Sequence, residues 1–232
     1  MAKHLNKREL VSPRLLLKYN KDNPPSKATK KKLIEAVKLS AEIMRSTVWK
    51  IDRVFFFSRS ESYLTDILTD HFRMGWVGET KKDHKKYLNL VRKIMLSTSF
   101  HLNTGTYLLD IDGNHRTTIG GNAIVLPPGV TMANVEGYVS NHTSRMLEKG
   151  PIHVNFELAS TYSARGLARL IIHEATHQFS NTVDVFYNHD PLYYGMTADR
   201  AVVNADSFAY AALSIHAKQL ETWQTLRNDG HH

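Results

Sequence analysis

Apolar residues recur at helical spacing through much of the chain, and this pattern predicts several amphipathic helices. After Lys27, for example, Leu33, Ile34 and Val37 fall on one side of a helix, and lysines occupy the other side. The same rhythm predicts helices over 27–50, 60–73, 79–97, 163–180 and 197–226.

The periodicity changes between about 100 and 160. This stretch is rich in Thr, Val, Asn and Gly, and pairs such as Gly120–Gly121 and Pro127–Pro128 separate short runs that are typical of strands. The run from Ile152 to Leu158 predicts one further strand. We therefore expect an α+β fold that is mainly helical and contains a small irregular β-sheet.

The pattern favours one domain with short flanking segments. Residues 1–26 predict an N-terminal extension, ended by the turn at Pro24 and Pro25. Residues 27–226 predict a single domain with a basic helical part at 27–98 and a second part at 99–226, and 227–232 predict a C-terminal tail. Trp49 and Trp76 have apolar surroundings and are expected in the core.

Composition excludes several classes of protein. The chain has 232 residues, of which 42% are apolar and 22% charged, which is typical of a soluble globular protein. No apolar run approaches the roughly 20 residues that span a bilayer, so we expect no membrane span. The chain has no cysteine and 13 histidines, so any metal site must use His, Asp or Glu.

Positive charge is concentrated in the first half of the chain. Residues 1–100 contain 22 Lys and Arg against 10 Asp and Glu, whereas 101–232 contain 8 against 12. The lysines alternate with apolar residues at helical spacing, which favours a solvated helix face. No zinc-finger, RRM or KH signature accompanies them, and we expect no nucleic-acid partner.

The strongest chemical signal lies within the predicted helix 163–180. His173 and His177 are four residues apart, so both imidazoles project from one face and can bind a single ion. Glu174 follows the first histidine, where a carboxylate can take a proton from a metal-bound water. This HExxH pattern is typical of zinc hydrolases, and it predicts Zn²⁺ as the cofactor.

A catalytic zinc needs a third protein ligand and keeps a further position open for water. Because cysteine is absent, this ligand must be His, Asp or Glu. The candidates downstream of the helix are Asp184, His189, Asp190, Asp199 and Asp206.

The residues after the helix resemble a known family, the aspzincin zinc metalloendopeptidases, which include deuterolysin and the fungal peptidyl-Lys metalloendopeptidases. In that family HExxH is followed by GTxDxxYG, and Thr182, Asp184 and Tyr187 match its TxDxxY part. Asn181 and Asn188 replace the two glycines. Asn is the non-glycine residue that best tolerates a left-handed backbone, so the replacement is mild.

Two further segments support the resemblance. Asn204–Ser207 is similar to an Asn-Ala-Asp-Ser segment that many members carry, and residues 72–78 resemble a Phe-x-x-Trp-Phe-Gly stretch of the family. The resemblance implies a zincin-like metallopeptidase fold with an HExxH active-site helix. The part at 99–226 is then the catalytic part.

The resemblance also implies a role for each residue of the motif. It makes His173, His177 and Asp184 the zinc ligands. Glu174 is then the general base, and Tyr187 is the hydrogen-bond donor to the tetrahedral oxyanion.

Asp206 corresponds to a family aspartate that faces the pocket for the residue after the cut bond, which makes it a substrate-binding residue. It is alternatively a partner that orients a ligand imidazole, or a carboxylate on the helix surface. In the Lys-specific enzymes a second acidic residue follows this aspartate by three positions. That position is Ala209 here, so the resemblance does not carry strict lysine specificity.

The sequence therefore predicts a zinc metalloendopeptidase that acts on a protein or peptide. The lack of cysteine and the polar N-terminus are similar to bacterial rather than secreted fungal members. We expect synthesis in the cytoplasm without a signal peptide, export by a signal-independent route as a toxin or effector, and control by a cognate inhibitor or immunity protein. Two alternatives remain open: a zinc amidohydrolase that acts on cell-wall peptides, and a basic module that binds nucleic acid or another anionic surface and has a degenerate HExxH.

Overall fold

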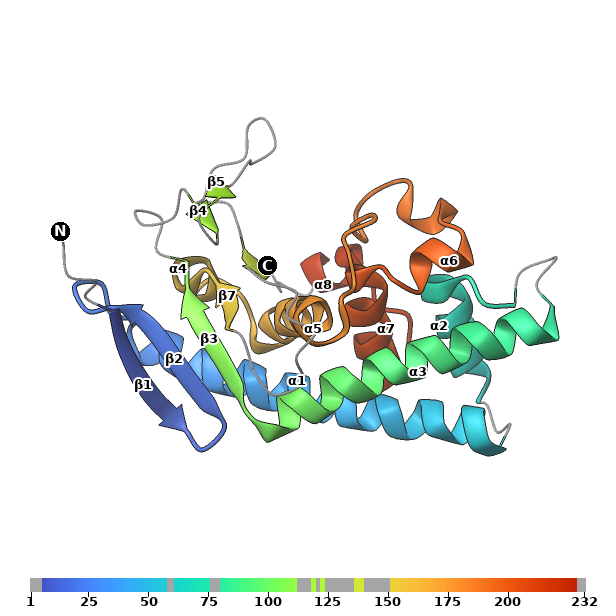
Figure 1. Ribbon diagram of the computed structural model, residues 1–232, viewed down its shortest axis with the longest axis horizontal. Helices are drawn as coiled ribbons and strands as arrows, with labels where there is room; N and C mark the ends of the chain where they lie inside the picture. Colours follow the sequence, from blue (N-terminus) through green and yellow to red (C-terminus); the bar gives the residue numbers. More distant parts are fainter. Residues whose placement is uncertain are drawn as a thin grey trace.

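The structure is a computed structural model that describes residues 6–57, 61–75, 80–111, 118–119, 122–123, 136–139 and 151–228. In it, helices make up one side of the molecule and a five-stranded sheet lies at the other (Figure 1). The predicted α+β, mainly helical class is confirmed. In chain order the elements are β1 (Asn6–Ser12), β2 (Leu15–Asn20), α1 (Lys27–Phe57), α2 (Ser62–Phe72), α3 (Lys81–Thr104), β3 (Thr106–Asp110), β4 (Thr118–Ile119), β5 (Asn122–Ala123), β6 (Gly137–Val139), β7 (Ile152–Val154), α4 (Phe156–Ala159), α5 (Ala164–Ser180), a 3₁₀ turn (Tyr193–Gly195), α6 (Ala198–Ala201), α7 (Ala205–Ala217) and α8 (Trp223–Asn228).

The sheet has the strand order β1-β2-β3-β7-β6. Strands β2, β3 and β7 are parallel, while the outer strands β1 and β6 run antiparallel to their neighbours. In β6, Gly137 is opposite Val154 of β7. This edge strand contacts α5, the helix that carries the HExxH pattern.

Helix α5 is the centre of the helical layer and packs against α1, α3 and α7. It begins where the Ser163 hydroxyl accepts the backbone N–H of Gly166 at 3.0 Å. It ends at Asn181, whose φ of 54° is the left-handed conformation expected from the replaced glycine. Its apolar stripe, which includes Leu167 and Ile171, is fully buried. The sequence pattern therefore placed both ends of this helix to within a residue.

The N-terminal segment is not a separate extension. Residues Asn6–Asn20 form β1 and β2, and β2 pairs with β3 in the sheet. Leu15, Leu17 and Tyr19 alternate toward the core and are almost completely buried. Their period of two is the physical reason why this segment belongs to the domain.

The structure differs from the predicted elements near the C-terminus as well. The segment 197–226 contains three helices rather than one. Asn204 interrupts it because its side-chain oxygen accepts the N–H of Val185 at 2.9 Å, and Lys218 has a left-handed φ of 59°. The predicted strand after Ile152 ends at Val154, because the side chain of Asn155 caps α4.

Trp49 does not lie in the core, and 58% of its surface is exposed. Trp76 and the last residues of the segment 72–78 lie outside the described residues. Among the helices that the structure describes, none is both long and apolar enough to cross a membrane.

Candidate metal centre

The two histidines of the HExxH pattern are buried side by side on α5. His173 is 4% exposed and His177 is 7% exposed, and their Nε2 atoms lie 3.1 Å apart. Both Nδ1 atoms hydrogen-bond away from this point. His173 Nδ1–H donates to Asp206 Oδ1 at 2.7 Å, and His177 Nδ1–H donates to the carbonyl oxygen of Thr182, also at 2.7 Å. The acceptors hold a proton on each Nδ1, so each Nε2 can offer its lone pair to a metal ion.

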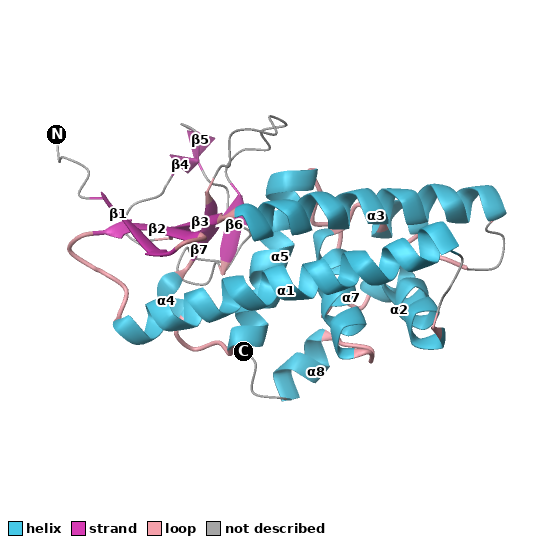
Figure 2. Ribbon diagram, turned by 90° about the horizontal axis from the view of Figure 1, so that it is seen from below, coloured by secondary structure: helices cyan, strands magenta, loops and turns pink. Residues whose placement is uncertain are grey.

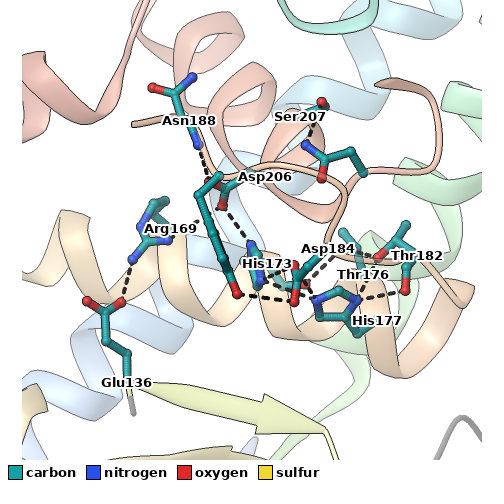
Figure 3. Close-up of polar contacts among 12 residues, drawn as sticks. Glu136, Arg169, His173, Thr176, His177, Thr182, Asp184, Asn188, Asp206 and Ser207 are labelled. Carbon is teal, nitrogen blue, oxygen red and sulfur yellow. Dashed lines mark hydrogen bonds and ion pairs between the residues drawn. The ribbon is translucent and has the colours of Figure 1, made fainter. Parts of the chain in front are cut away.

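The loop after α5 brings Asp184 to the same point. Val183 forms a bridge with Asn204, in which its N–H donates to the carbonyl of Val203 at 2.9 Å and its carbonyl accepts from Ala205 at 3.0 Å. Asp184 Oδ1 then lies 3.1 Å from His173 Nε2 and 3.2 Å from His177 Nε2 (Figure 3). The register between the loop and the start of α7 therefore sets the position of the carboxylate.

The three facing atoms fit a zinc ion. Nε2 of His173, Nε2 of His177 and Oδ1 of Asp184 form a triangle with sides of 3.1 to 3.2 Å. Tetrahedral zinc bound at about 2.0–2.1 Å needs ligand atoms roughly 3.3 Å apart. The donor set fits too, because two lone pairs and a carboxylate oxygen that converge on one point require a cation or a proton between them.

Electrostatics around this triangle favour positive charge. Burial opposes a charge on His173, but its hydrogen bonds with Asp184 and Asp206 outweigh burial and raise its pKa to about 10. Burial also opposes the Asp184 carboxylate, yet the contacts with His173 and His177 hold its pKa well below the ordinary range. The centre therefore binds positive charge strongly.

Among the other candidate ligands, Asp206 lies behind His173, and Asp199 accepts a hydrogen bond from Tyr87 on the surface. His189 stacks on Tyr187, and its ring is tilted by 52° against that of Trp223. The group of possible metal ligands that the described residues form is His173, His177 and Asp184.

Asp206 anchors a hydrogen-bond network on the far side of His173 (Figure 3). Its Oδ2 accepts the backbone N–H of Asn188 at 2.7 Å, and Arg169 Nη1 lies 3.7 Å from its Oδ1. Arg169 also donates to Glu136, the residue before β6, at 2.8 Å. Burial opposes the charge of Asp206, but the bond to His173 and the nearby Arg169 lower its pKa.

This placement differs from the predicted substrate-binding role of Asp206. Both carboxylate oxygens are bound within the protein, and the residue is 2% exposed. The geometry instead favours the alternative in which Asp206 orients a ligand imidazole.

The prediction from the sequence did not include Arg169 or Glu136. The spacing of Arg169, four residues before His173 on the same helix face, was a usable signal. Asn188 also differs from expectation. Its φ is not left-handed, and its side-chain oxygen accepts the N–H of Trp223 at 2.6 Å.

Glu174 lies between α5 and the edge strand β6. It is 4% exposed, its Oε2 has no hydrogen-bond partner among the residues that the structure describes, and burial raises its pKa. Gly137 of β6 approaches it so closely that a Cβ there would lie 3.1 Å from Glu174 Oε1 and 2.9 Å from the carbonyl oxygen of His153. A buried carboxylate with a free oxygen and a raised pKa has the properties of a general base.

Tyr187 lies at the open side of the centre. Its hydroxyl is 3.3 Å from Asp184 Oδ2, its ring stacks on His173 with centroids 6.1 Å apart, and 43% of its surface is exposed. Burial and the neighbouring Asp184 raise its pKa, so the phenol keeps its proton. It is therefore a donor close to the three ligand atoms.

Comparison with known proteins identifies the fold of this chain. No family model matches the chain, and no curated protein sequence matches it. Its structure is similar to that of a zinc peptidase from Grifola frondosa, with a TM-score of 0.53 over 83% of this chain and 98% of the other. The chain has a zincin-like peptidase fold. The two sequences are 15% identical, so the likeness extends to the fold alone.

Proposed function

We propose that this protein is a zinc-dependent metalloendopeptidase that acts on a protein or peptide. The observation that carries the proposal is the convergence of His173 Nε2, His177 Nε2 and Asp184 Oδ1, with the unpartnered Oε2 of Glu174 on the next residue of the same helix. The likeness in fold to a zinc peptidase supports it.

Each residue of the centre has a task in this mechanism. His173, His177 and Asp184 would hold the zinc ion, which when bound would supply Lewis-acid activation of water and of the scissile carbonyl. Glu174 takes the proton of the attacking water at its free oxygen and passes it to the leaving amine, for which its raised pKa is suited. Tyr187 donates its hydroxyl hydrogen to the oxyanion, a role worth about 10²–10³ in rate for comparable donors.

Lysine specificity is not part of the proposal. Asp206 is 2% exposed and both of its oxygens accept hydrogen bonds within the protein, so it is not accessible to a cationic side chain of a substrate. Ala209 is fully buried in α7 and carries no charge. Any preference for particular residues next to the cleaved bond must therefore come from other groups around the metal centre.

One incubation series tests the proposed activity. The protein is mixed separately with a denatured protein, a peptide library and peptidoglycan, and the products are identified by mass spectrometry. We expect new termini within polypeptides, no cleavage after treatment with a chelator, and recovery with about one equivalent of zinc. Cleavage that withstands complete zinc removal, or products from peptidoglycan alone, would contradict the proposal.

A further inference from the structure

Helices α1 and α3 expose several large apolar side chains. Trp49, Phe56 and Phe57 on α1 are 58%, 59% and 68% exposed, and Leu96 and Phe100 on α3 are 43% and 60% exposed. Single exposed apolar residues are common on soluble proteins, whereas several on two neighbouring helices mark an interaction surface. We refer to these five side chains as the aromatic face.

The two helices are antiparallel neighbours, and Figure 2 looks onto both of them. Arg92 Nε donates to Asp52 Oδ1 at 2.6 Å, and Asn103 Nδ2 donates to the carbonyl oxygen of Ala41 at 3.3 Å. These two contacts fix the register and place Leu96 and Phe100 alongside the second half of α1. The aromatic face is thus a set of exposed side chains on adjoining parts of α1 and α3, with Phe57 at the end of α1.

Cationic side chains are interspersed with the apolar ones. The guanidinium of Arg53 lies 4.8 Å from the ring centre of Trp49, and that of Arg92 lies 4.7 Å from the ring centre of Phe56. Residues Trp49, Arg53 and Phe56 are four and three positions apart, so they share one side of α1.

The wider surface around the aromatic face is basic too. Arg45 on α1 and Lys93 on α3 are exposed. Of the acidic neighbours, Asp52 is paired with Arg92, Glu61 lies 3.9 Å from Arg53, and Glu42 is exposed seven residues before Trp49. Basic residues still outnumber acidic ones in this part of the chain, with 22 Lys and Arg against 10 Asp and Glu among positions 1–100.

We propose that the aromatic face docks on a membrane that contains anionic lipids. Trp and Phe side chains enter the interface between headgroups and acyl chains, and the flanking Lys and Arg side chains contact the lipid phosphates. A single-stranded nucleic acid is a poorer fit, because base stacking needs free ring faces and guanidinium groups lie over Trp49 and Phe56.

This orientation leaves the metal centre accessible. Helix α5 packs against α1 and α3, whose buried residues form the core, whereas the aromatic face consists of exposed residues of the same two helices. A docked molecule would therefore hold its metal centre away from the lipid surface. Membrane docking does not depend on peptidase activity, so a failure of one proposal would leave the other unaffected.

Co-sedimentation of the full chain with vesicles tests the proposal. One set of vesicles is phosphatidylcholine alone, and the other contains about 30% phosphatidylserine. We expect binding to the anionic vesicles to be at least about tenfold tighter and to weaken with salt. Equal binding to both vesicles, or binding to neither, would overturn the proposal, as would binding to a single-stranded oligonucleotide in its place.

Surface variants assign the binding to this face. Trp49→Ser with Phe56→Ser removes two rings, and Arg45→Glu with Lys93→Glu reverses two charges. Each pair should weaken anionic vesicle binding at least about tenfold, since one cation near such a surface contributes about fivefold. Leu192→Ser is the matched control, because Leu192 is 60% exposed on the loop after α5. All five positions are exposed, so thermal unfolding should remain unchanged, and folded variants that still bind vesicles normally would refute the assignment.

Discussion

Replacing Asp206 by Asn tests how the protein orients a zinc ligand. The carboxylate accepts His173 Nδ1–H with one oxygen and Asn188 N–H with the other, each at 2.7 Å. An amide has only one acceptor oxygen. Either the imidazole or the backbone N–H would therefore face an NH₂ group in a site that is 2% exposed.

The expected loss is in zinc affinity. A buried hydrogen bond to a charged group contributes about 1.5–3 kcal/mol, and partners that orient a metal ligand typically change metal affinity 10–100-fold. We expect Asp206→Asn to raise the zinc dissociation constant by a factor in that range, which corresponds to about 1.4–2.7 kcal/mol. The variant should still fold, because Arg169 keeps its bond with Glu136.

The assay is competition with a chelator of known zinc affinity at neutral pH, together with thermal unfolding of the zinc-free proteins. Asp199→Asn is the control. The Asp199 side chain is 72% exposed and accepts a hydrogen bond from Tyr87. The zinc affinity of the Asp199→Asn protein should therefore match that of the unmodified protein. If Asp206→Asn binds zinc within about twofold of the unmodified protein, Asp206 does not orient the ligand.

Three further changes have distinct expected results. Gly137→Ala should lower the cleavage rate more than tenfold with zinc still bound, because the new methyl group would crowd Glu174. Gly195→Ala is the control: a Cβ there meets no neighbouring atom, so the cleavage rate in the same assay should not change. Tyr187→Phe should lower cleavage about 10²-fold without a comparable change in zinc content, and unchanged rates would remove the hydroxyl from the mechanism. Burial lowers the pKa of His71 from 6.5 to about 3. Between these pH values the unfolded chain binds a proton that the folded chain does not. The free energy of unfolding therefore falls as the pH drops from 6.5 toward 3, by about 2 kcal/mol at pH 5. Denaturant unfolding of the zinc-free protein should show this loss relative to His71→Gln, and parallel pH profiles would contradict it.

The group of three candidate ligands was predictable because its members are close in sequence. The spacing of His173 and His177 follows from the helix period, and Asp184 comes only seven residues later. The sequence could not decide between the alternative roles of Asp206, and it did not predict the contact between Gly137 and Glu174. Both depend on how α7 and β6 pack on α5, and no periodicity in the sequence encodes those contacts.

The same distinction explains the errors in the fold. The first three predicted helices are strongly periodic, and their starts were placed within about two residues, but α1 and α3 extend seven residues beyond the predicted ends at 50 and 97. The alternation of Leu15, Leu17 and Tyr19 was short, and a strand there is stabilised by pairing with β1 and with β3, which lies far along the sequence. Trp49 is a hydrophobic residue, but its type does not determine whether it is buried. Its exposure depends on which side of α1 packs on α3 and α5.

The most direct test of the central claim is Glu174→Gln, with zinc content and peptide cleavage measured on the same sample. The substitution keeps the size of the side chain and removes its ability to take a proton. The account predicts about one zinc per chain, as in the unmodified protein, and a loss of cleavage of at least about 10²-fold. A zinc-loaded Glu174→Gln protein that cleaves peptides at the normal rate would contradict it.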